Sequence, residues 1–269
     1  MLLLAAGSWL SVKTDSDKNS QLSDIDKNLI QQIRILRPNQ NEIVFRKRNR
    51  HWFLSEPYEI AANQLRISSV LNLLDANSVQ QYPLANLNPA EFGLKPAKAT
   101  VYFDEHVFHF GSDEPIGGNR YLQVGEMLHL LADNHFPLVT AGVDTLIDRK
   151  LIPEIYDVAA YHLAEFTISE TDSLGWQIDP ADPKLNANNL QHWVDQWRSA
   201  EAIDVALTQQ PNNQDGRKIT VALNNDETIY FDIIQRDQWQ GLFRADRKLA
   251  YGLSKQTLKA LLDKPSPNN

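Results

Sequence analysis

The chain has 269 residues, of which 42% are hydrophobic and 22% are charged, and its formal net charge is −8 at pH 7. This length can hold one large domain or two small ones, and the composition is that of an ordinary globular protein. The negative charge argues against a nucleic-acid-binding protein, because phosphate contacts require a clustered basic surface. The chain contains no cysteine, which excludes disulfide bonds, thiol catalysis and cysteine-ligated metal sites.

The first stretch of the chain, residues 1–12, is apolar and uncharged, and Lys13 is the first ionisable side chain. A helix of this length reaches about 18 Å, which is short of the roughly 30 Å hydrocarbon core of a membrane. A secretory signal would also begin with a basic stretch, which is missing here. We therefore expect residues 1–26 to hold the end of a truncated membrane anchor followed by a polar linker. An apolar helix packed on the domain is the alternative.

The next segments have the alternation of short β-strands. Residues 29–36, 42–46 and 51–54 predict a three-stranded meander, which Pro57 ends because proline has no N–H to donate to a ladder. Residues 61–75 predict an amphipathic helix, since one face carries the apolar side chains at helical spacing. These side chains are Leu65, Ile67, Val70, Leu71 and Leu74.

Two hairpins and a weak helix complete the first half of the chain. The predicted strands are residues 100–103, 106–110, 120–124 and 127–131, and the weak helix covers residues 136–147. The second half has the same order of elements. Its predicted strands and helices are residues 158–168, 175–178, 186–199 (helix), 218–223, 228–234, 241–245, 249–253 and 256–262 (helix).

This common order indicates an internal duplication. Trp52 and Pro57 open the first copy as Trp176 and Pro180 open the second, and a similar tetrapeptide follows each tryptophan. Across the two copies we match Trp52 with Trp176, Leu65 with Leu190, Val101 with Val221, Phe108 with Tyr230, and Leu122 with Phe243. We therefore expect an α+β protein of two tandem related repeats, each a mainly antiparallel sheet with one long and one short helix. The predicted boundaries are residues 27–153 for repeat 1, 154–264 for repeat 2 and 265–269 for a tail.

Structural anchors are the expected role of the residues that open each copy. They are Trp52, Pro57, Leu65, Trp176, Pro180 and Leu190. Trp193 and Trp197 lie one helical turn apart and therefore share a helix face, which either packs on the sheet or docks a partner. Arg120 follows a glycine pair and could help to cradle an anion, although a flexible loop explains the glycines more simply. These three residues form the possible interaction surface.

Catalytic and metal-binding patterns are missing from the sequence. His106 and His109 lie three apart in a predicted strand, which places them on opposite faces and argues against joint metal ligation. The adjacent carboxylates, such as Asp104-Glu105, fall in predicted turns, where they are too solvated for acid–base chemistry. Neither a Gly-x-Ser-x-Gly elbow nor a phosphate-binding loop occurs. We therefore predict no catalytic, cofactor-binding or metal-binding residues.

Several short motifs resemble a known bacterial family. Phe92-Gly93-Leu94-Lys95-Pro96 precedes a strand, and Phe110-Gly111 and Arg120-Tyr121 follow; Arg149-Lys150-Leu151-Ile152-Pro153 is similar to that family's segment between repeats. With the Trp-x-Leu hairpin and the helix after it, this pattern resembles the domain-of-unknown-function family 4340 over residues 27–262. Members typically carry an N-terminal membrane helix and an extracytoplasmic region, and they often accompany ABC-transporter components, including gliding-motility-type auxiliary proteins.

The resemblance implies an inner-membrane-anchored periplasmic protein whose partner is an ABC-transporter permease or an associated membrane protein. The family has no established catalytic residues to transfer. Our leading hypothesis is therefore a non-enzymatic accessory or scaffold protein that acts through protein–protein contacts, without a cofactor. The alternative is a module that binds a small ligand or an envelope polymer in the cleft between the repeats. A hydrolase is a third hypothesis, which a cluster of inward-facing carboxylates and histidines would support.

Overall fold

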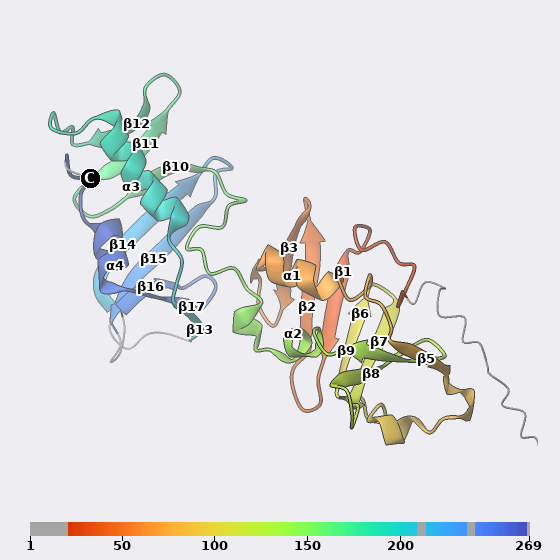
Figure 1. The fold of residues 1–269 in the computed structure, drawn as a ribbon. Helices are drawn as coiled ribbons and strands as arrows, with labels where there is room; N and C mark the ends of the chain where they lie inside the picture. The colour runs from red at the N-terminus through yellow and green to blue at the C-terminus, as the bar shows by residue number, and fades with distance from the viewer. Residues whose placement is uncertain (1–20, 209–213, 236–239, 268–269) are drawn as a thin grey trace, which may run out of the picture.

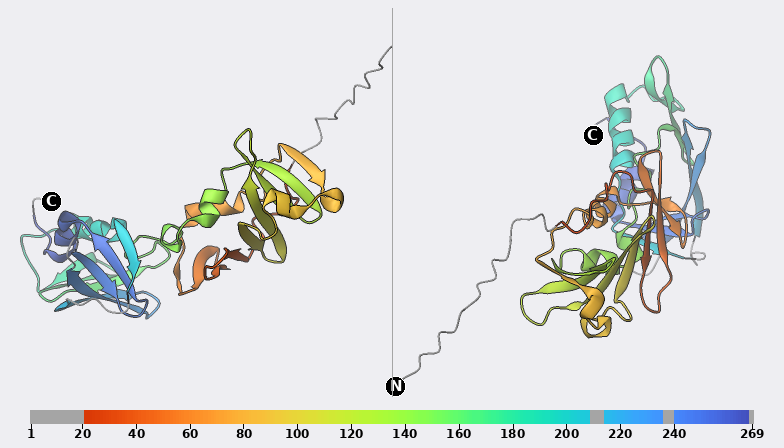
Figure 2. Two further views of the ribbon diagram at one scale, coloured as in Figure 1. Left: turned by 90° about the horizontal axis from the view of Figure 1, so that it is seen from below. Right: turned by 90° about the vertical axis from the view of Figure 1, so that its right-hand side faces the viewer.

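The computed structural model describes residues 21–208, 214–235 and 240–267, so the predicted anchor and most of the linker after it lie outside the described residues. The described chain forms two lobes that lie end to end (Figures 1 and 2). Each lobe contains one large antiparallel sheet and a few short helices, which confirms the expected α+β class. Within these residues, no helix has both the length and the apolar character needed to cross a membrane.

The first lobe is built on a nine-stranded sheet. In spatial order its strands are β4 (Ile60–Ala61), β3 (His51–Glu56), β2 (Ile43–Arg48), β1 (Gln32–Leu36), β6 (Ala99–Phe103), β7 (His106–Asp113), β8 (Asn119–Val124), β9 (Met127–Ala132) and β5 (Gln80–Pro83). Its helical segments are α1 (Gln64–Leu71), α2 (Phe136–Thr140) and the 3-10 turns η1 (Leu84–Asn86), η2 (Pro89–Phe92) and η3 (Val143–Thr145).

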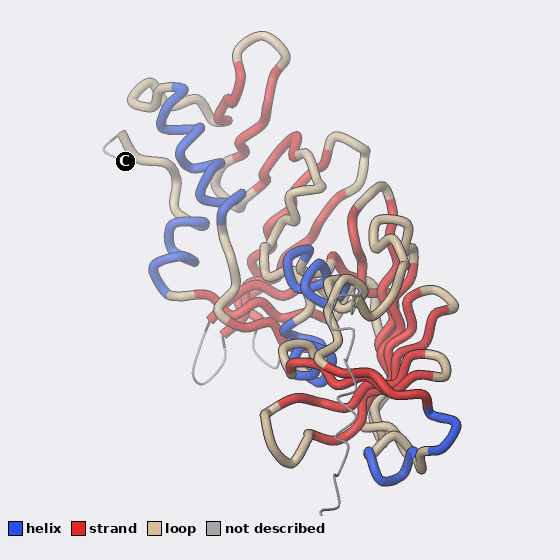
Figure 3. Tube along the Cα trace, turned by 45° about the vertical axis from the view of Figure 1, so that its right-hand side comes forward, coloured by secondary structure: helices blue, strands red, loops and turns tan. Residues whose placement is uncertain are grey.

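The second lobe is built on an eight-stranded sheet. In spatial order its strands are β12 (Gly175–Asp179), β11 (Thr167–Thr171), β10 (Val158–His162), β14 (Gln214–Leu223), β15 (Thr228–Gln235), β16 (Gln240–Arg244), β17 (Leu249–Leu253) and β13 (Asp204–Leu207). Its helices are α3 (Ala187–Ser199) and α4 (Lys255–Leu262). In both lobes the α-helices pack on one face of the sheet (Figure 3), and the main apolar core lies between these two layers, whereas η1 and η2 pack on the opposite face of the first sheet.

The two sheets have the same strand order once the short β4 is set aside. The first reads β3-β2-β1-β6-β7-β8-β9-β5, and the second reads β12-β11-β10-β14-β15-β16-β17-β13. In each lobe a three-stranded meander leads through a helix to the strand at one edge, and a four-stranded meander then fills the space between. The edge strands β5 and β13 were absent from the sequence prediction.

Side-chain caps fix where the main helices begin. Asn63 accepts a hydrogen bond from the Arg66 N–H at the start of α1. Asn186 forms a reciprocal capping box with Asn189 at the start of α3. Such caps satisfy N–H groups that have no partner inside the helix. The two asparagines therefore mark equivalent starting points for comparing α1 with α3.

The predicted match of Leu65 with Leu190 is wrong. Counted from the caps, Leu190 corresponds to Ile67, and both of these side chains are buried. Leu65 lies in the first turn of α1 and is 81% exposed, so it does not anchor the core. Leu65 lies two residues before Ile67, about 200° around the helix, so it does not share the apolar face of Ile67 and Val70.

The predicted match of Phe108 with Tyr230 is also wrong, by one residue. Val101 pairs with Phe108 across the first hairpin, and Val221 pairs with Ile229 across the second. Ile229 is buried like Phe108, whereas Tyr230 is 58% exposed. A shift of one residue moves a strand side chain to the other face of the sheet.

The match of Leu122 with Phe243 has the same error. Leu122 and Leu242 both pack in the main core. Phe243 packs instead in a separate small cluster with Ile234 and Ala250. Phe243 therefore lies on the other face of its sheet from Leu242 and does not match Leu122 in its packing.

The segment that joins the lobes, residues 146–151, is hydrogen-bonded to both of them. Its Ile147 forms an antiparallel bridge with Ala62 of the first lobe, and its Lys150 forms one with Glu201 just before β13. On the far side of the junction, the Arg247 guanidinium donates to the carbonyl of Glu59 at 2.9 Å. The lobes are thus connected through main-chain pairing.

Candidate functional site

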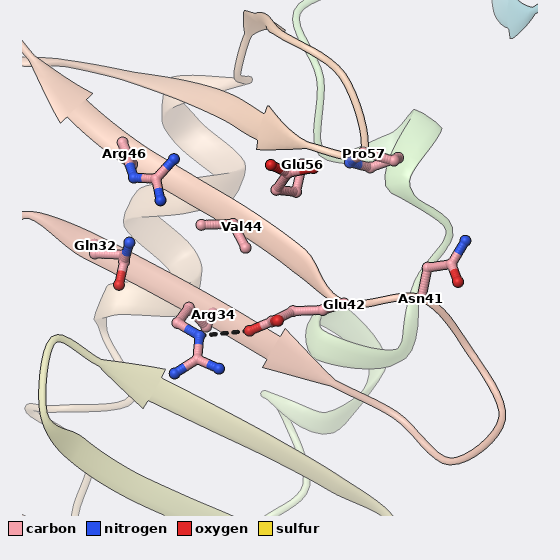
Figure 4. Close-up of a pocket in the computed structure, with 8 residues that line it drawn as sticks. All are labelled: Gln32, Arg34, Asn41, Glu42, Val44, Arg46, Glu56 and Pro57. Atoms are coloured by element: carbon pink, nitrogen blue, oxygen red, sulfur yellow. Dashed lines mark hydrogen bonds and ion pairs between the residues drawn. The ribbon is translucent and has the colours of Figure 1, made fainter.

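A hollow with a volume of about 660 Å³ lies on the outer face of the first sheet, over β1, β2 and β3. Ligand sites in proteins commonly have volumes of about 300–1,000 Å³. Figure 4 shows the side chains that line it, which come from these strands and from the turns beside them. They are Gln32, Arg34, Asn41, Glu42, Val44, Arg46, Glu56 and Pro57. We name this feature the β1–β3 hollow.

Strand alternation explains why polar side chains gather there. In β1, Ile33 and Ile35 point into the core, so Gln32 and Arg34 point to the outer face. The registers then place Gln32 opposite Arg46 and Arg34 opposite Val44 on the neighbouring strand. The side chains of three strands therefore converge on one surface.

Arg34 is the most firmly oriented of these side chains. Its Nε donates to Oε1 of Glu42 in a short ion pair, drawn as the dashed line in Figure 4. The Arg34 guanidinium also lies over the Tyr102 ring, 4.7 Å from its centroid. The aromatic face and the carboxylate together restrict its rotamer, so that its remaining N–H groups have a fixed direction.

Arg46 and Glu56 lie on either side of Val44 and have no hydrogen-bond or ion-pair partner among the described residues. Both side chains are exposed, whereas Val44 is buried and forms the floor. With Arg34 and Glu42 the lining carries two positive and two negative charges, so its formal charge is zero. Because the charges balance, this lining suits a ligand that is bound through hydrogen bonds.

The sequence prediction did not include the β1–β3 hollow. The available signal was the alternation Gln32-Ile33-Arg34-Ile35, which places polar groups on the uncovered face of a strand. The β2 residues that lie opposite Gln32 and Arg34 could not be identified without knowing the register between β1 and β2.

Trp193 and Trp197 do not form an interaction surface, and that prediction is wrong. Both are buried between α3 and the rest of the second lobe. The indole N–H of Trp193 donates to the carbonyl of Asp263 at 2.9 Å, and that of Trp197 donates to the carbonyl of Leu261 at 3.1 Å. They thus satisfy carbonyl groups at the C-terminal end of α4, which an isolated helix leaves without partners.

Arg120 is also buried, with 7% of its surface exposed, so its predicted role in an interaction surface is wrong. Its Nε and Nη2 each donate to the Asp133 carboxylate at 3.0 Å, and it also pairs with Asp113. Its guanidinium carbon lies 3.6 Å from the centroid of the Phe136 ring. Because its donors are engaged inside the protein, Arg120 is not available to cradle an external anion.

The other predicted anchors lie at equivalent places in the two lobes. Trp52 and Trp176 are each the second residue of their strands, β3 and β12, and both are buried. Pro57 and Pro180 each follow directly after these strands, and the peptide bond before each proline is cis. Leu190 is buried in the core.

The histidines of β7 and β9 do not lie on one face of the sheet, because His109 faces away from the core whereas His129 faces it. His106 lies at the exposed start of β7, and His109 is hydrogen-bonded to the Thr100 hydroxyl at 3.1 Å. His129 is 4% exposed, its Nδ1 has no partner among the described groups, and burial lowers its pKa. Across residues 21–208, 214–235 and 240–267, no group of three or more His, Asp or Glu side chains could hold a metal ion.

Smaller hollows of about 220–360 Å³ surround the C-terminal end of α4 in the second lobe. All three are lined in part by Asp263, and two of them by Lys264. Lys264 is held by Asp182 at 2.9 Å. These hollows, like the β1–β3 hollow, lie within one lobe and do not extend across the junction.

Comparison with known proteins identifies the family. The family model "Domain of unknown function (DUF4340)" matches residues 52–225. The chain belongs to the DUF4340 family. The resemblance expected from the sequence motifs is thereby confirmed. No curated protein and no solved structure matches the chain. The DUF4340 match runs from β3 to the turn after β14, so it covers part of each lobe and the segment between them.

Proposed function

We propose that this DUF4340 protein is a non-enzymatic accessory or scaffold protein that acts through protein–protein contacts of two related repeats. The observation that supports this most directly is the pair of lobes with one strand order, joined by a segment that is hydrogen-bonded to both. Two similar lobes held in this way present two related surfaces at a defined separation. A scaffold needs this property, whereas an enzyme needs converging reactive groups.

The tandem duplication is part of the proposal. The cap residues Asn63 and Asn186, and the buried Trp52 and Trp176, occupy equivalent positions in the two lobes. We place repeat 1 at residues 27–153 and repeat 2 at residues 154–264. In each repeat the tryptophan strand leads into the longer helix of the lobe.

We further propose that the protein works outside the cytoplasm, attached to the inner membrane through its N-terminal segment. The partner would be a permease or another membrane component of an ABC-type transport system. The apolar residues 1–12 and the family resemblance support this placement. The hydrogen-bonded junction fits the role, because a scaffold between membrane partners must keep its two lobes in a constant arrangement.

The decisive experiment is a crosslinking pull-down of the full-length gene product from its native membranes, combined with cell fractionation. We expect the protein in the membrane fraction and a transporter permease among the crosslinked proteins. A matched variant with Leu4→Lys and Leu10→Lys, which interrupts the apolar segment, should move to the soluble fraction. If the unmodified protein is soluble and captures no permease, the proposed function is wrong.

The alternative of a binding module that uses a cleft between the repeats receives no support from the hollows described, because each of them lies within one lobe. A ligand-binding role therefore has to be considered at the β1–β3 hollow itself.

A further inference from the structure

We infer that the β1–β3 hollow binds an uncharged polysaccharide chain. The inference goes beyond the proposed scaffold function and does not depend on it. The hollow has room for a few sugar units, with a volume of about 660 Å³. Its rim is open to solvent at Asn41, Arg46 and Glu56, so a polymer can reach the lining side chains.

The lining groups match the chemistry of sugar hydroxyls. Arginine, glutamine, asparagine and glutamate side chains end in planar groups, each with two or more donors or acceptors in one plane. Adjacent hydroxyls on a sugar ring can both donate and accept, so they pair with such groups two at a time. Gln32 and Arg46 lie opposite each other across the β1–β2 ladder, and Glu56 pairs in register with Val44. Donors and acceptors are thus interleaved on one surface.

The orientation of these groups is partly fixed before a ligand arrives. Arg34 is held between Glu42 and the Tyr102 ring. Fixing a side chain in advance lowers the entropy lost when a ligand binds. Arg46 and Glu56, in contrast, have no described partner and can turn toward a ligand.

The charge of the lining favours a neutral polymer as the ligand over an ionic one. The two arginines are balanced by two glutamates, so the hollow offers no net attraction to a polyanion. The net charge of the whole chain, −8, opposes a polyanion further. An uncharged glycan leaves this balance of charges unchanged.

A peptide is a less suitable ligand for this surface. Extended peptides bind mainly through main-chain hydrogen bonds at the edge of a sheet. The main-chain groups of β1 and β2 are already engaged by the strands on either side of them. Only side chains face the hollow, and side chains are what a glycan requires.

The test uses the full chain and a fixed panel of probes. The panel contains maltohexaose, cellohexaose, chitohexaose, hexagalacturonate and an uncharged serine-rich hexapeptide, each titrated to millimolar concentration by calorimetry. We expect at least one neutral hexasaccharide to bind. In the double variant Arg46→Ala/Glu56→Ala, its affinity should fall about tenfold or more, because two hydrogen-bonding groups are removed.

The matched control is Arg66→Ala/Glu105→Ala, which removes one exposed charge of each sign away from the hollow. It should bind the sugar as the unmodified chain does. Thermal unfolding of both double variants should match that of the unmodified chain, since all four side chains are exposed. The inference is overturned if no neutral hexasaccharide binds, if only the acidic sugar or the peptide binds, or if the control loses affinity equally.

Discussion

At the scale of single residues, buried polar side chains hold separate segments of this protein together. Trp197 belongs to α3, but its N–H donates to a carbonyl near the end of α4, 64 residues further along the chain. Arg120 joins β8 to Asp133 and to the Phe136 ring in the same way. A buried polar group without a partner costs about 1–3 kcal/mol, so these contacts matter more for stability than for recognition.

We therefore expect Trp197→Phe to lower the free energy of unfolding by about 1–3 kcal/mol, because it leaves the carbonyl of Leu261 without its donor. Urea denaturation followed by circular dichroism measures this change. Tyr230→Phe is the matched control, since Tyr230 lies on the exposed face of β15 and its change should stay within about 0.5 kcal/mol. Equal stability of the two variants would contradict the capping role.

Burial of histidines makes the stability depend on pH. It lowers the pKa of His109, His129 and His135 below the ordinary value of 6.5. The unfolded chain then binds more protons than the folded chain once the pH falls below about 6.5, so stability is full above that pH and declines on acidification. Burial raises the pKa of Asp148 above its ordinary value of 3.8. This shift has the opposite effect on stability, because it lowers stability as the pH rises above about 3.8.

We expect the urea midpoint to fall between pH 7 and pH 5, and His129→Leu to reduce the slope of that fall. The reason is that His129 is the most deeply buried of the three and its Nδ1 has no partner among the described groups. His162→Leu, at an exposed position of β10, is the control and should leave the slope unchanged. An unchanged slope in His129→Leu would show that this histidine does not govern the pH dependence.

At the scale of secondary-structure elements, the face that α1 turns to the core is set by the spacing of its apolar side chains. Ile67, Val70 and Leu71 are buried, whereas Leu65, two residues before Ile67, points to solvent. We expect Ile67→Ala to cost about 2–5 kcal/mol of unfolding free energy, because it leaves a cavity in the core. Leu65→Glu should change stability by no more than about 0.5 kcal/mol. If instead Leu65→Glu proved the more damaging change in denaturant unfolding, the assigned helix face would be wrong.

Most strands and the main helices were predictable from alternation, turn residues and caps, as the hairpin at Asp104-Glu105 shows. The short edge strands were not: β5 is exposed at every residue and carries no alternating pattern. The β1–β3 hollow could not be predicted because it depends on which residues face each other across strands. The errors at Tyr230 and Phe243 have the same origin, since register is a tertiary property.

At the scale of the whole molecule, the junction between the lobes is the feature that sets the distance between their surfaces. The N–H of Ala202 donates to the carbonyl of Arg149 at 2.9 Å, and the N–H of Asp148 donates to the carbonyl of Ala61 at 2.9 Å. Main-chain bonds to both lobes leave this segment fewer conformations than a free linker would have.

We expect a narrow distance distribution between spin labels attached at Glu105→Cys and Glu227→Cys, one in each lobe. The chain has no native cysteine, so the labels attach only at these sites. Ala202→Pro removes the N–H that pairs with Arg149 and should broaden the distribution. Double electron–electron resonance measures both. A broad distribution in the chain without the proline would mean that the lobes move independently.

The hydrogen-bonded junction has a mechanical consequence. Residues 146–151 form main-chain hydrogen bonds with both lobes. A force that pulls the two lobes apart would therefore act on several of these hydrogen bonds at once, instead of first extending a flexible linker. The two lobes would then move together as one stiff unit. A displacement of whatever binds one lobe would be carried directly to whatever binds the other.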